Sequence, residues 1–185
     1  MIGSSFARTP LQQWPPGRGF SADLGRWKVA WLKPRHEKAF ADELRAADFP
    51  YYLPLVERTH RRPGNGKPKK ALMPLFPTYL SFAAAGPTTP LYQTGRIIRI
   101  LPVGDQERFI EDLQNVLRLL TAGLPVEVHP GLCPGKMVRI VQGPLKGLTG
   151  LVERLGDHCR FWINVELFNR SVAVPMPCDH LAPLE

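Results

Sequence analysis

The segment VRIVQGPLKGLTGLVERL, residues 138–155, constrains the fold more than any other part of the chain. Two runs of alternating apolar and polar residues, a pattern typical of half-buried strands, flank a stretch with three glycines and a proline. Gly147 lies where the backbone must take a positive φ or bend sharply, which glycine does without a Cβ clash. The segment therefore predicts a β-hairpin.

The rest of the C-terminal part continues this pattern. The runs KMVRIVQ, TGLVERL, RFWINVELF and SVAVP are short and rich in β-branched residues, and Gly, Asp and Asn turns separate them. Because about fifty residues of short strands with regular turns are typical of small barrels, we expect a strongly bent β-barrel over residues 135–185.

The preceding part shows a different order of elements. Residues 27–33 predict a strand, and Pro34 is expected to start a helix whose apolar stripe includes Phe40 and Leu44. Three further strands and a second amphipathic helix, ending at Gly123, follow along the chain. This order predicts an α+β domain over residues 26–122, with an antiparallel sheet and helices packed on it.

Two segments are expected to lie outside these domains. Residues 1–25 lack a continuous apolar core of the kind found in signal peptides and predict a flexible leader. Residues 123–134 are proline-rich and predict a linker. No apolar run approaches the length of a membrane span, so we expect no membrane partner. The lack of a secretory signal predicts the cytoplasm, and we expect a monomer.

The chain is basic, with a net charge of +8. Residues 1–70 hold 14 Lys and Arg against 6 Asp and Glu, whereas residues 71–185 hold 10 against 10. Such asymmetry indicates a surface that faces phosphates or an acidic partner. A solvated basic face that serves only solubility is an equally good interpretation of the charge alone.

Cysteine usage indicates free thiols. Cys133, Cys159 and Cys178 are odd in number and widely spaced, which disfavours a disulfide framework and fits a reducing compartment. His129, His158 and His180 lie near them, but no CxxC or HxxxH pair is present. We therefore expect no metal and no other cofactor.

Local enzyme motifs are incomplete. HEKAF places Phe40 where a metalloprotease helix needs its second histidine, and GPLKGLTG lacks the order of a phosphate-binding loop. No GxSxG pattern occurs either. We expect a protein that is not an enzyme.

Two stretches together resemble one family. The hairpin GPLKGLTGLV with its flanking strands resembles the KOW motif, and WKVAWLKPRHEKAFADEL followed by MPLFPTYLSF resembles the N-terminal (NGN) domain of the NusG family of transcription elongation factors. The resemblance spans residues 26–185, and PLFPTYL is especially similar to the specialised RfaH-like paralogs. It implies an NGN domain followed by an SH3-like KOW barrel.

The resemblance implies that the N-terminal domain binds the β′ clamp helices of RNA polymerase through an apolar patch and reduces pausing or termination. Thr88 and Thr89 match a motif that contacts the β gate loop, although Pro87 replaces its histidine. Ser81 stands where RfaH has an aromatic residue, which implies a shallower pocket. The residues implied at the polymerase patch are Tyr79, Ser81, Ile100 and Val103.

Other residues match regions that face nucleic acid or further partners. The basic arm, residues 58–70, could reach upstream DNA or the polymerase, or serve only as a solubilising turn. ELFNR matches the KOW loop that binds the termination factor Rho and the ribosomal protein NusE, through Leu167, Phe168 and Arg170. Alternation places Phe168 opposite Leu167, so an inward-facing side chain at one of the two positions is the alternative. The residues implied near the non-template DNA strand are Lys33, Arg35, His36 and Lys38.

Two alternatives to an elongation factor stay open. A basic sheet or barrel could be a stand-alone RNA-binding module, although LFPTYLSF lacks the glycines of the RNP1 pattern. A ribosome-associated KOW protein is the other alternative, and it leaves the N-terminal domain unexplained.

Overall fold

The computed structural model describes residues 12–60, 69–155 and 158–184. The chain divides into two compact units, Met1–Gln106 and Glu107–Glu185. Each unit contains an antiparallel sheet and one α-helix of more than two turns, so the mixed α+β class and the antiparallel sheets agree with the prediction. No helix in the described ranges is long and apolar enough to cross a membrane.

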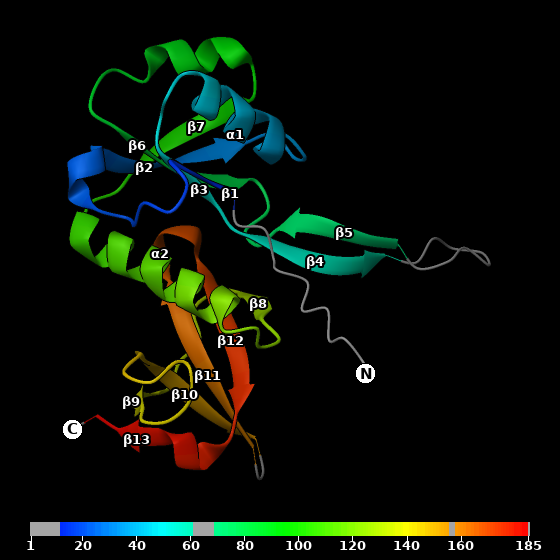
Figure 1. Cartoon of the computed structure of the whole chain (residues 1–185), viewed down its shortest axis with the longest axis vertical. Coiled ribbons are helices and arrows are strands. Elements are labelled where there is room, and N and C mark those ends of the chain that lie inside the picture. Colours follow the sequence, from blue (N-terminus) through cyan, green and yellow to red (C-terminus); the bar gives the residue numbers. More distant parts are fainter. Residues whose placement is uncertain (1–11, 61–68, 156–157, 185) are drawn as a thin grey trace. The chain divides into compact units, whose positions relative to one another are not determined.

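The first unit is built on a five-stranded antiparallel sheet with the order β1-β3-β6-β2-β7. Helix α1 (Glu37–Ala46) covers one face of this sheet, and its Phe40 and Leu44 pack on Ala30, Leu32 and Phe82 (Figure 1). The strands are β1 (Gln12–Trp14), β2 (Arg26–Leu32), β3 (Tyr51–Leu53), β6 (Tyr79–Ala84) and β7 (Ile97–Pro102).

Helix α1 starts three residues later than predicted. Arg35 has a φ of 68°, a left-handed value that does not continue into a helix, and His36 is the N-cap residue. The helix ends before Asp48, which is also left-handed, with a φ of 56°. The proline at position 34 therefore precedes a turn instead of the first helical turn.

The predicted leader contributes to the sheet. Residues 12–14 form β1, which pairs with β3, and Trp14 packs against the core beneath α1. A short 3-10 helix, η1 (Ala22–Leu24), follows before β2. Residues 12–25 are thus part of the folded unit, which their lack of strand periodicity did not predict; residues 1–11 lie outside the described ranges.

A two-stranded hairpin extends away from this sheet (Figure 1). Its strands are β4 (Leu55–His60) and β5 (Lys69–Pro74), which contain the two ends of the predicted basic arm, residues 58–70. The arm's most basic part, residues 61–68, lies outside the described residues. A 3-10 helix, η2 (Thr89–Thr94), connects β6 to β7.

The second unit contains most of helix α2 (Gln106–Thr121) and a six-stranded antiparallel sheet with the order β13-β9-β10-β11-β12-β8. Phe161, Ile163, Val165 and Val172 are buried in its core. The strands are β8 (Glu127–Pro130), β9 (Lys136–Ile140), β10 (Thr149–Leu155), β11 (His158–Val165), β12 (Arg170–Met176) and β13 (Leu181–Pro183).

The glycine-rich hairpin forms as predicted. β9 and β10 pair antiparallel, Gly147 has a φ of 88°, and its N–H donates to the Ile140 carbonyl at 2.7 Å. Gly150 has a separate, steric role, because a Cβ there would lie 2.5 Å from Cζ of Phe161. The motif therefore combines a left-handed turn with a close strand approach.

The unit boundary differs from the predicted domain limits. α2 was expected to close the first domain at residue 122, but its contacts group it with the C-terminal sheet. The predicted linker, 123–134, includes β8, which pairs with β12. An amphipathic helix shows in its sequence that one face is buried, but not which of two sheets buries that face.

The prediction of free thiols was wrong for two cysteines. Cys159 of β11 and Cys178 of the 3-10 helix η4 (Cys178–His180) form a disulfide, and Cys133 is free. Their separation of 19 residues conceals the contact in the sequence. The path of β12 and η4 brings the two side chains together, since Cys159 pairs with Met176, two residues before Cys178.

Candidate functional site

The face of the first sheet opposite α1 presents an aromatic pair, which we call the Trp31–Tyr79 pair. The two residues are direct cross-strand partners of β2 and β6, and Arg99 of β7 pairs with Trp31 from the other side. The Trp31 side chain is 39% exposed, Tyr79 is half-buried, and Arg99 is exposed. A large aromatic surface beside a cation is thus accessible on this face.

A buried carboxylate fixes the turn before Tyr79. Thr78 has a φ of 69°, and its N–H donates to Glu37 Oε1 at 2.7 Å, while its carbonyl accepts from Leu32 N–H at 2.8 Å. Glu37 is only 5% exposed. The motifs HEKAF and LFPTYL therefore meet in space, and α1 positions the start of the strand that carries Tyr79.

The other end of the same face is closed. Ser81 pairs with Tyr52, and both side chains are buried. Phe20 covers this end, with its ring centroid 5.6 Å from Trp27 and 4.6 Å from Tyr52. The Trp27 Nε1–H donates to the Ser21 carbonyl at 3.1 Å and holds the covering segment in place. Ser81 therefore shares the face of Tyr79 but is not accessible.

The remaining residues of the predicted polymerase patch lie elsewhere. Ile100 pairs with Ala30 and packs against the core on the α1 side, so the structure places it on the face opposite Tyr79. Val103 is buried just beyond β7, where its carbonyl accepts from the Gln106 side chain. The alternation of side chains along β7 separates Ile100 from Tyr79.

The predicted gate-loop residues precede β7. Thr88 is the N-cap residue of η2 and its carbonyl accepts from Leu91 N–H at 3.1 Å. Thr88 is half-buried and Thr89 is exposed. Thr89 is thus the more accessible of the two hydroxyl groups.

The basic cluster near α1 is only partly free. Lys33 Nζ donates to the Gly95 carbonyl at 2.6 Å, and Lys38 Nζ donates to the Leu72 carbonyl at 2.7 Å. Arg35 is exposed and has no hydrogen bond or ion pair with another residue in the described ranges. Of these three cations, Arg35 is the most available to a phosphate.

His36 takes part in a chain of side-chain contacts that the sequence did not predict. Arg96 Nη1 lies 2.8 Å from His36 Nδ1, and Arg96 Nε donates to Glu43 Oε1 at 2.7 Å. Because a guanidinium only donates, Nδ1 must accept, and the proton of the neutral ring lies on Nε2. Arg96 is 60 residues from His36 in sequence, so no local signal could identify it.

The candidate partner loop of the second unit, residues 166–170, begins with the 3-10 helix η3 (Glu166–Phe168). Phe168 is only 3% exposed, and its ring lies edge-on to Phe109 of α2, with centroids 6.0 Å apart. Arg108 of α2 forms an ion pair with Glu166 at 2.7 Å. Leu167 and Arg170 are half-buried. The predicted aromatic anchor is therefore covered within its own unit.

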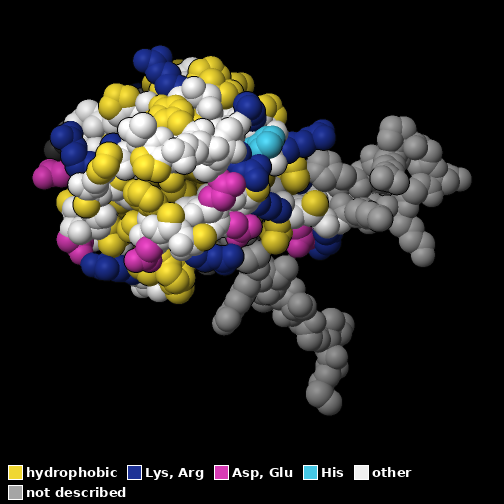
Figure 2. Space-filling view, turned by 90° about the horizontal axis from the view of Figure 1, so that it is seen from above, with side chains coloured by type: hydrophobic (Ala, Val, Ile, Leu, Met, Phe, Trp, Pro, Cys, Tyr) yellow, Lys and Arg dark blue, Asp and Glu magenta, His cyan; other side chains and the backbone are white. Residues whose placement is uncertain are grey.

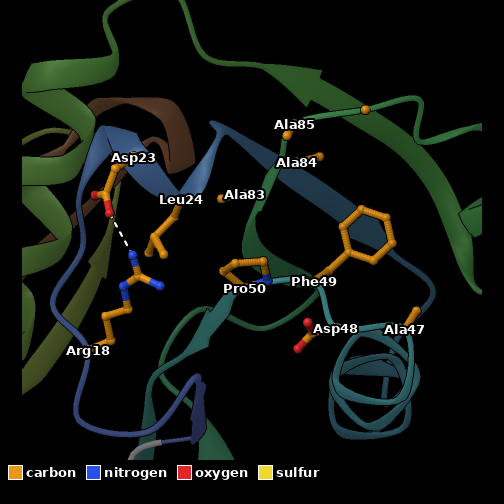
Figure 3. A pocket seen from close by; sticks show the side chains of 11 residues that line it. Arg18, Asp23, Leu24, Ala47, Asp48, Phe49, Pro50, Ala83, Ala84 and Ala85 are labelled. Atoms are coloured by element: carbon orange, nitrogen blue, oxygen red, sulfur yellow. Dashed lines mark hydrogen bonds and ion pairs between the residues drawn. The ribbon is translucent and has the colours of Figure 1, made fainter.

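A cavity of about 380 Å³ lies in the first unit, between the segment before β2, the end of α1 and the end of β6 (Figure 3). Four alanines are among its lining residues, and the ion pair of Arg18 with Asp23 lies at its edge.

No described group of three or more His, Cys, Asp or Glu could hold a metal ion. The face drawn in Figure 2 intersperses apolar, cationic and acidic side chains.

No protein-family model and no curated protein matches this sequence. Among solved structures, the chain is similar to one chain of the "Crystal Structure of MjSpt4:Spt5 complex conformation B", with 14% sequence identity and a TM-score of 0.29. The match covers 86% of this chain and 97% of that chain. A likeness of this size carries no argument about activity or partners.

Proposed function

We propose that this chain is a non-catalytic transcription elongation factor whose first unit binds the clamp helices of RNA polymerase and reduces pausing or termination. The observation that carries the proposal is the Trp31–Tyr79 pair, an accessible aromatic surface on the sheet face that α1 leaves uncovered. The NusG-like motif PLFPTYL, which contains Tyr79, supports the same assignment.

The surface suits a protein helix as its partner. Trp and Tyr are the side chains that most often anchor interfaces, because they bury much area with few rotatable bonds. Arg99 beside Trp31 supplies a charge at the rim, where charges guide association more than they add affinity. The clamp helices of the polymerase are a partner of this kind.

Other parts of the chain have secondary roles in this proposal. Arg35 contacts phosphates of the non-template DNA strand, and the Nε2–H of His36 faces a base or phosphate. Thr89, with Thr88 behind it, approaches the gate loop. The loop 166–170 binds NusE or Rho through the partly exposed Leu167 and Arg170. The protein works as a cytoplasmic monomer without a cofactor.

A pull-down with core RNA polymerase, followed by a pause assay, tests the proposal. We expect Trp31→Ala and Tyr79→Ala each to weaken binding by roughly 10- to 30-fold, the loss typical of an anchor residue. Met137→Ala is the matched control, because Met137 is 48% exposed but lies on β9 of the second unit. Wild-type chain that does not bind the polymerase would falsify the proposal.

The second candidate function is direct RNA binding, either alone or on the ribosome. One observation favours it: exposed aromatic rings beside an arginine on a sheet also form a stacking platform for bases. Filter binding with single-stranded RNA and co-sedimentation with ribosomal subunits separate the two functions. Tight, salt-sensitive binding in the absence of polymerase supports the RNA-binding alternative.

A further inference from the structure

We propose that the disulfide between Cys159 and Cys178 is a reversible redox latch on the C-terminal segment 178–183, which consists of η4 and β13. The oxidised latch holds this segment on the second sheet, and a dithiol releases the segment by reducing the bond. The latch lies wholly within the second unit, so it does not depend on the proposed polymerase contact of the first unit.

The segment 178–183 has little besides the disulfide to hold it. Neither η4 nor β13 contains a fully buried side chain. β13 pairs with β9 through only three residues, and the last of them, Pro183, has no N–H to donate. Because segments with few buried apolar contacts open at low cost in free energy, the covalent bond is the main restraint on this one.

The two sulfur atoms differ in their surroundings. Cys178 is half-buried, whereas Cys159 is only 6% exposed, so an incoming thiolate reaches the Cys178 sulfur first. Arg154 of β10 is the direct cross-strand partner of Cys159, so their side chains lie on the same face of the sheet. A neighbouring cation stabilises a thiolate, which makes Cys159 the better leaving group.

The reaction is thiol–disulfide exchange with a dithiol. One thiolate of the dithiol attacks Sγ of Cys178, forms a mixed disulfide and expels Cys159 as a thiolate, which takes up a proton. The second thiol of the reductant, after losing its proton, attacks the reductant's own sulfur in the mixed disulfide, and Cys178 leaves and is protonated. The protein thus gains two electrons and two protons, and the dithiol loses both. Oxidised glutathione reverses the change and becomes two glutathione thiols.

Release of the segment changes the edge of the sheet. β9 pairs with β10 on one side and with β13 on the other. Once β13 leaves, this second side of β9 carries unpaired backbone groups. The latch therefore couples the order of the C-terminal segment, and the exposure of a strand edge, to the thiol redox state around the protein.

The experiment measures amide hydrogen exchange in the purified full chain, before and after treatment with dithiothreitol. Two amides report on the segment: Val141 N–H donates to the His180 carbonyl at 2.8 Å, and Leu184 N–H donates to the Met137 carbonyl at 3.1 Å. We expect reduction to lower the protection of both amides roughly 10- to 100-fold. The long β11–β12 ladder should stay better protected than either amide in the reduced protein.

Cysteine variants separate the latch from a general effect of the reductant. Cys178→Ser should show the fast exchange without dithiothreitol and should not respond to it. Cys133→Ser removes the free thiol and should behave like the wild type. Oxidised glutathione should restore slow exchange in the reduced wild type but not in Cys178→Ser. Unchanged protection of Val141 and Leu184 after complete reduction overturns the latch.

The rate of reduction tests reversibility and the role of Arg154. Thiol titration of the folded protein follows the reaction, and we expect Arg154→Gln to slow it about 3-fold. Lys146→Gln, which removes an exposed cation from the turn between β9 and β10, should leave the rate unchanged. A bond that dithiothreitol reduces only after urea has unfolded the chain is a permanent cross-link and overturns the proposal. Equal rates for the two variants remove Arg154 from it.

Discussion

At the scale of single residues, Tyr52 places a hydroxyl group in a fully buried site. Its Oη has no hydrogen-bond partner among the described residues, and Phe20 and Ser81 lie against it. Burial raises the pKa of Tyr52 well above the ordinary value of 10.0, because a phenolate cannot be solvated there. Such a group costs stability that its aromatic ring more than offsets.

Tyr52→Phe should therefore stabilise the first unit by about 1 kcal/mol at pH 7, since it removes an unpaired hydroxyl without a change of shape. The gain should grow above pH 10. The unfolded tyrosine ionises there while the folded one stays neutral, so the wild type loses roughly 1.4 kcal/mol per pH unit. Urea unfolding of both proteins at pH 7 and pH 10.5 measures this, and a pH-independent difference would contradict it.

The contrast between Arg35 and Lys38 gives a second prediction. Arg35→Gln should weaken binding to single-stranded DNA and reduce the log–log salt slope by about 0.7, as expected for one lost phosphate contact. Lys38→Gln should change the slope less, because its ammonium already donates to the Leu72 carbonyl. Fluorescence anisotropy between 50 and 200 mM salt measures both slopes. Equal slopes for the two variants would show that Arg35 is not the phosphate contact.

At the scale of elements, the disulfide fixes the way in which the second sheet ends. β13 has three residues and pairs only with β9 among the described strands. The bond from Cys159 holds η4, which leads directly into β13, against β11. It therefore restricts a short edge strand that few hydrogen bonds could hold.

Reduction should lower the free energy of unfolding of the second unit by about 3 kcal/mol, since the bond closes a loop of about twenty residues. Trp162 reports on this transition, because it is the one tryptophan after residue 106. Urea unfolding with and without dithiothreitol measures the loss. Cys159→Ser should reproduce it, whereas Cys133→Ser should not; equal stability with and without reductant argues against the cross-link.

Elements with a strong local pattern were predictable from the sequence, and those set by distant contacts were not. The β9–β10 hairpin and the positive φ of Gly147 follow from glycine spacing and alternation. β1 has only three residues, and its place depends on Trp14 packing beneath α1. The same holds at the candidate site: Tyr79 lies on the accessible face, but the cover that Phe20 forms over Ser81 has no local signal.

At the scale of the whole molecule, the sequence predicted two structural units, but it did not predict the position along the chain at which one ends and the other begins. Helical periodicity identified α2, whereas its contacts with Phe168 and with the Lys146 carbonyl group it with the C-terminal sheet. The charge distribution was likewise predictable only in part. The surplus of Lys and Arg in residues 1–70 is plain in the sequence, but side-chain contacts decide which cations can meet a phosphate.

Phe20 has a practical consequence for anyone who shortens this protein. A chain that starts at Arg26 would keep every long strand of the first sheet. It would lack Phe20, however, whose ring packs on Trp27 and Tyr52 and covers them. Two newly solvent-exposed aromatic rings on one face of the sheet favour self-association. The shortened chain should therefore aggregate under conditions in which the intact chain does not. The segment before β2 that contains Phe20 thus protects the intact chain from aggregation.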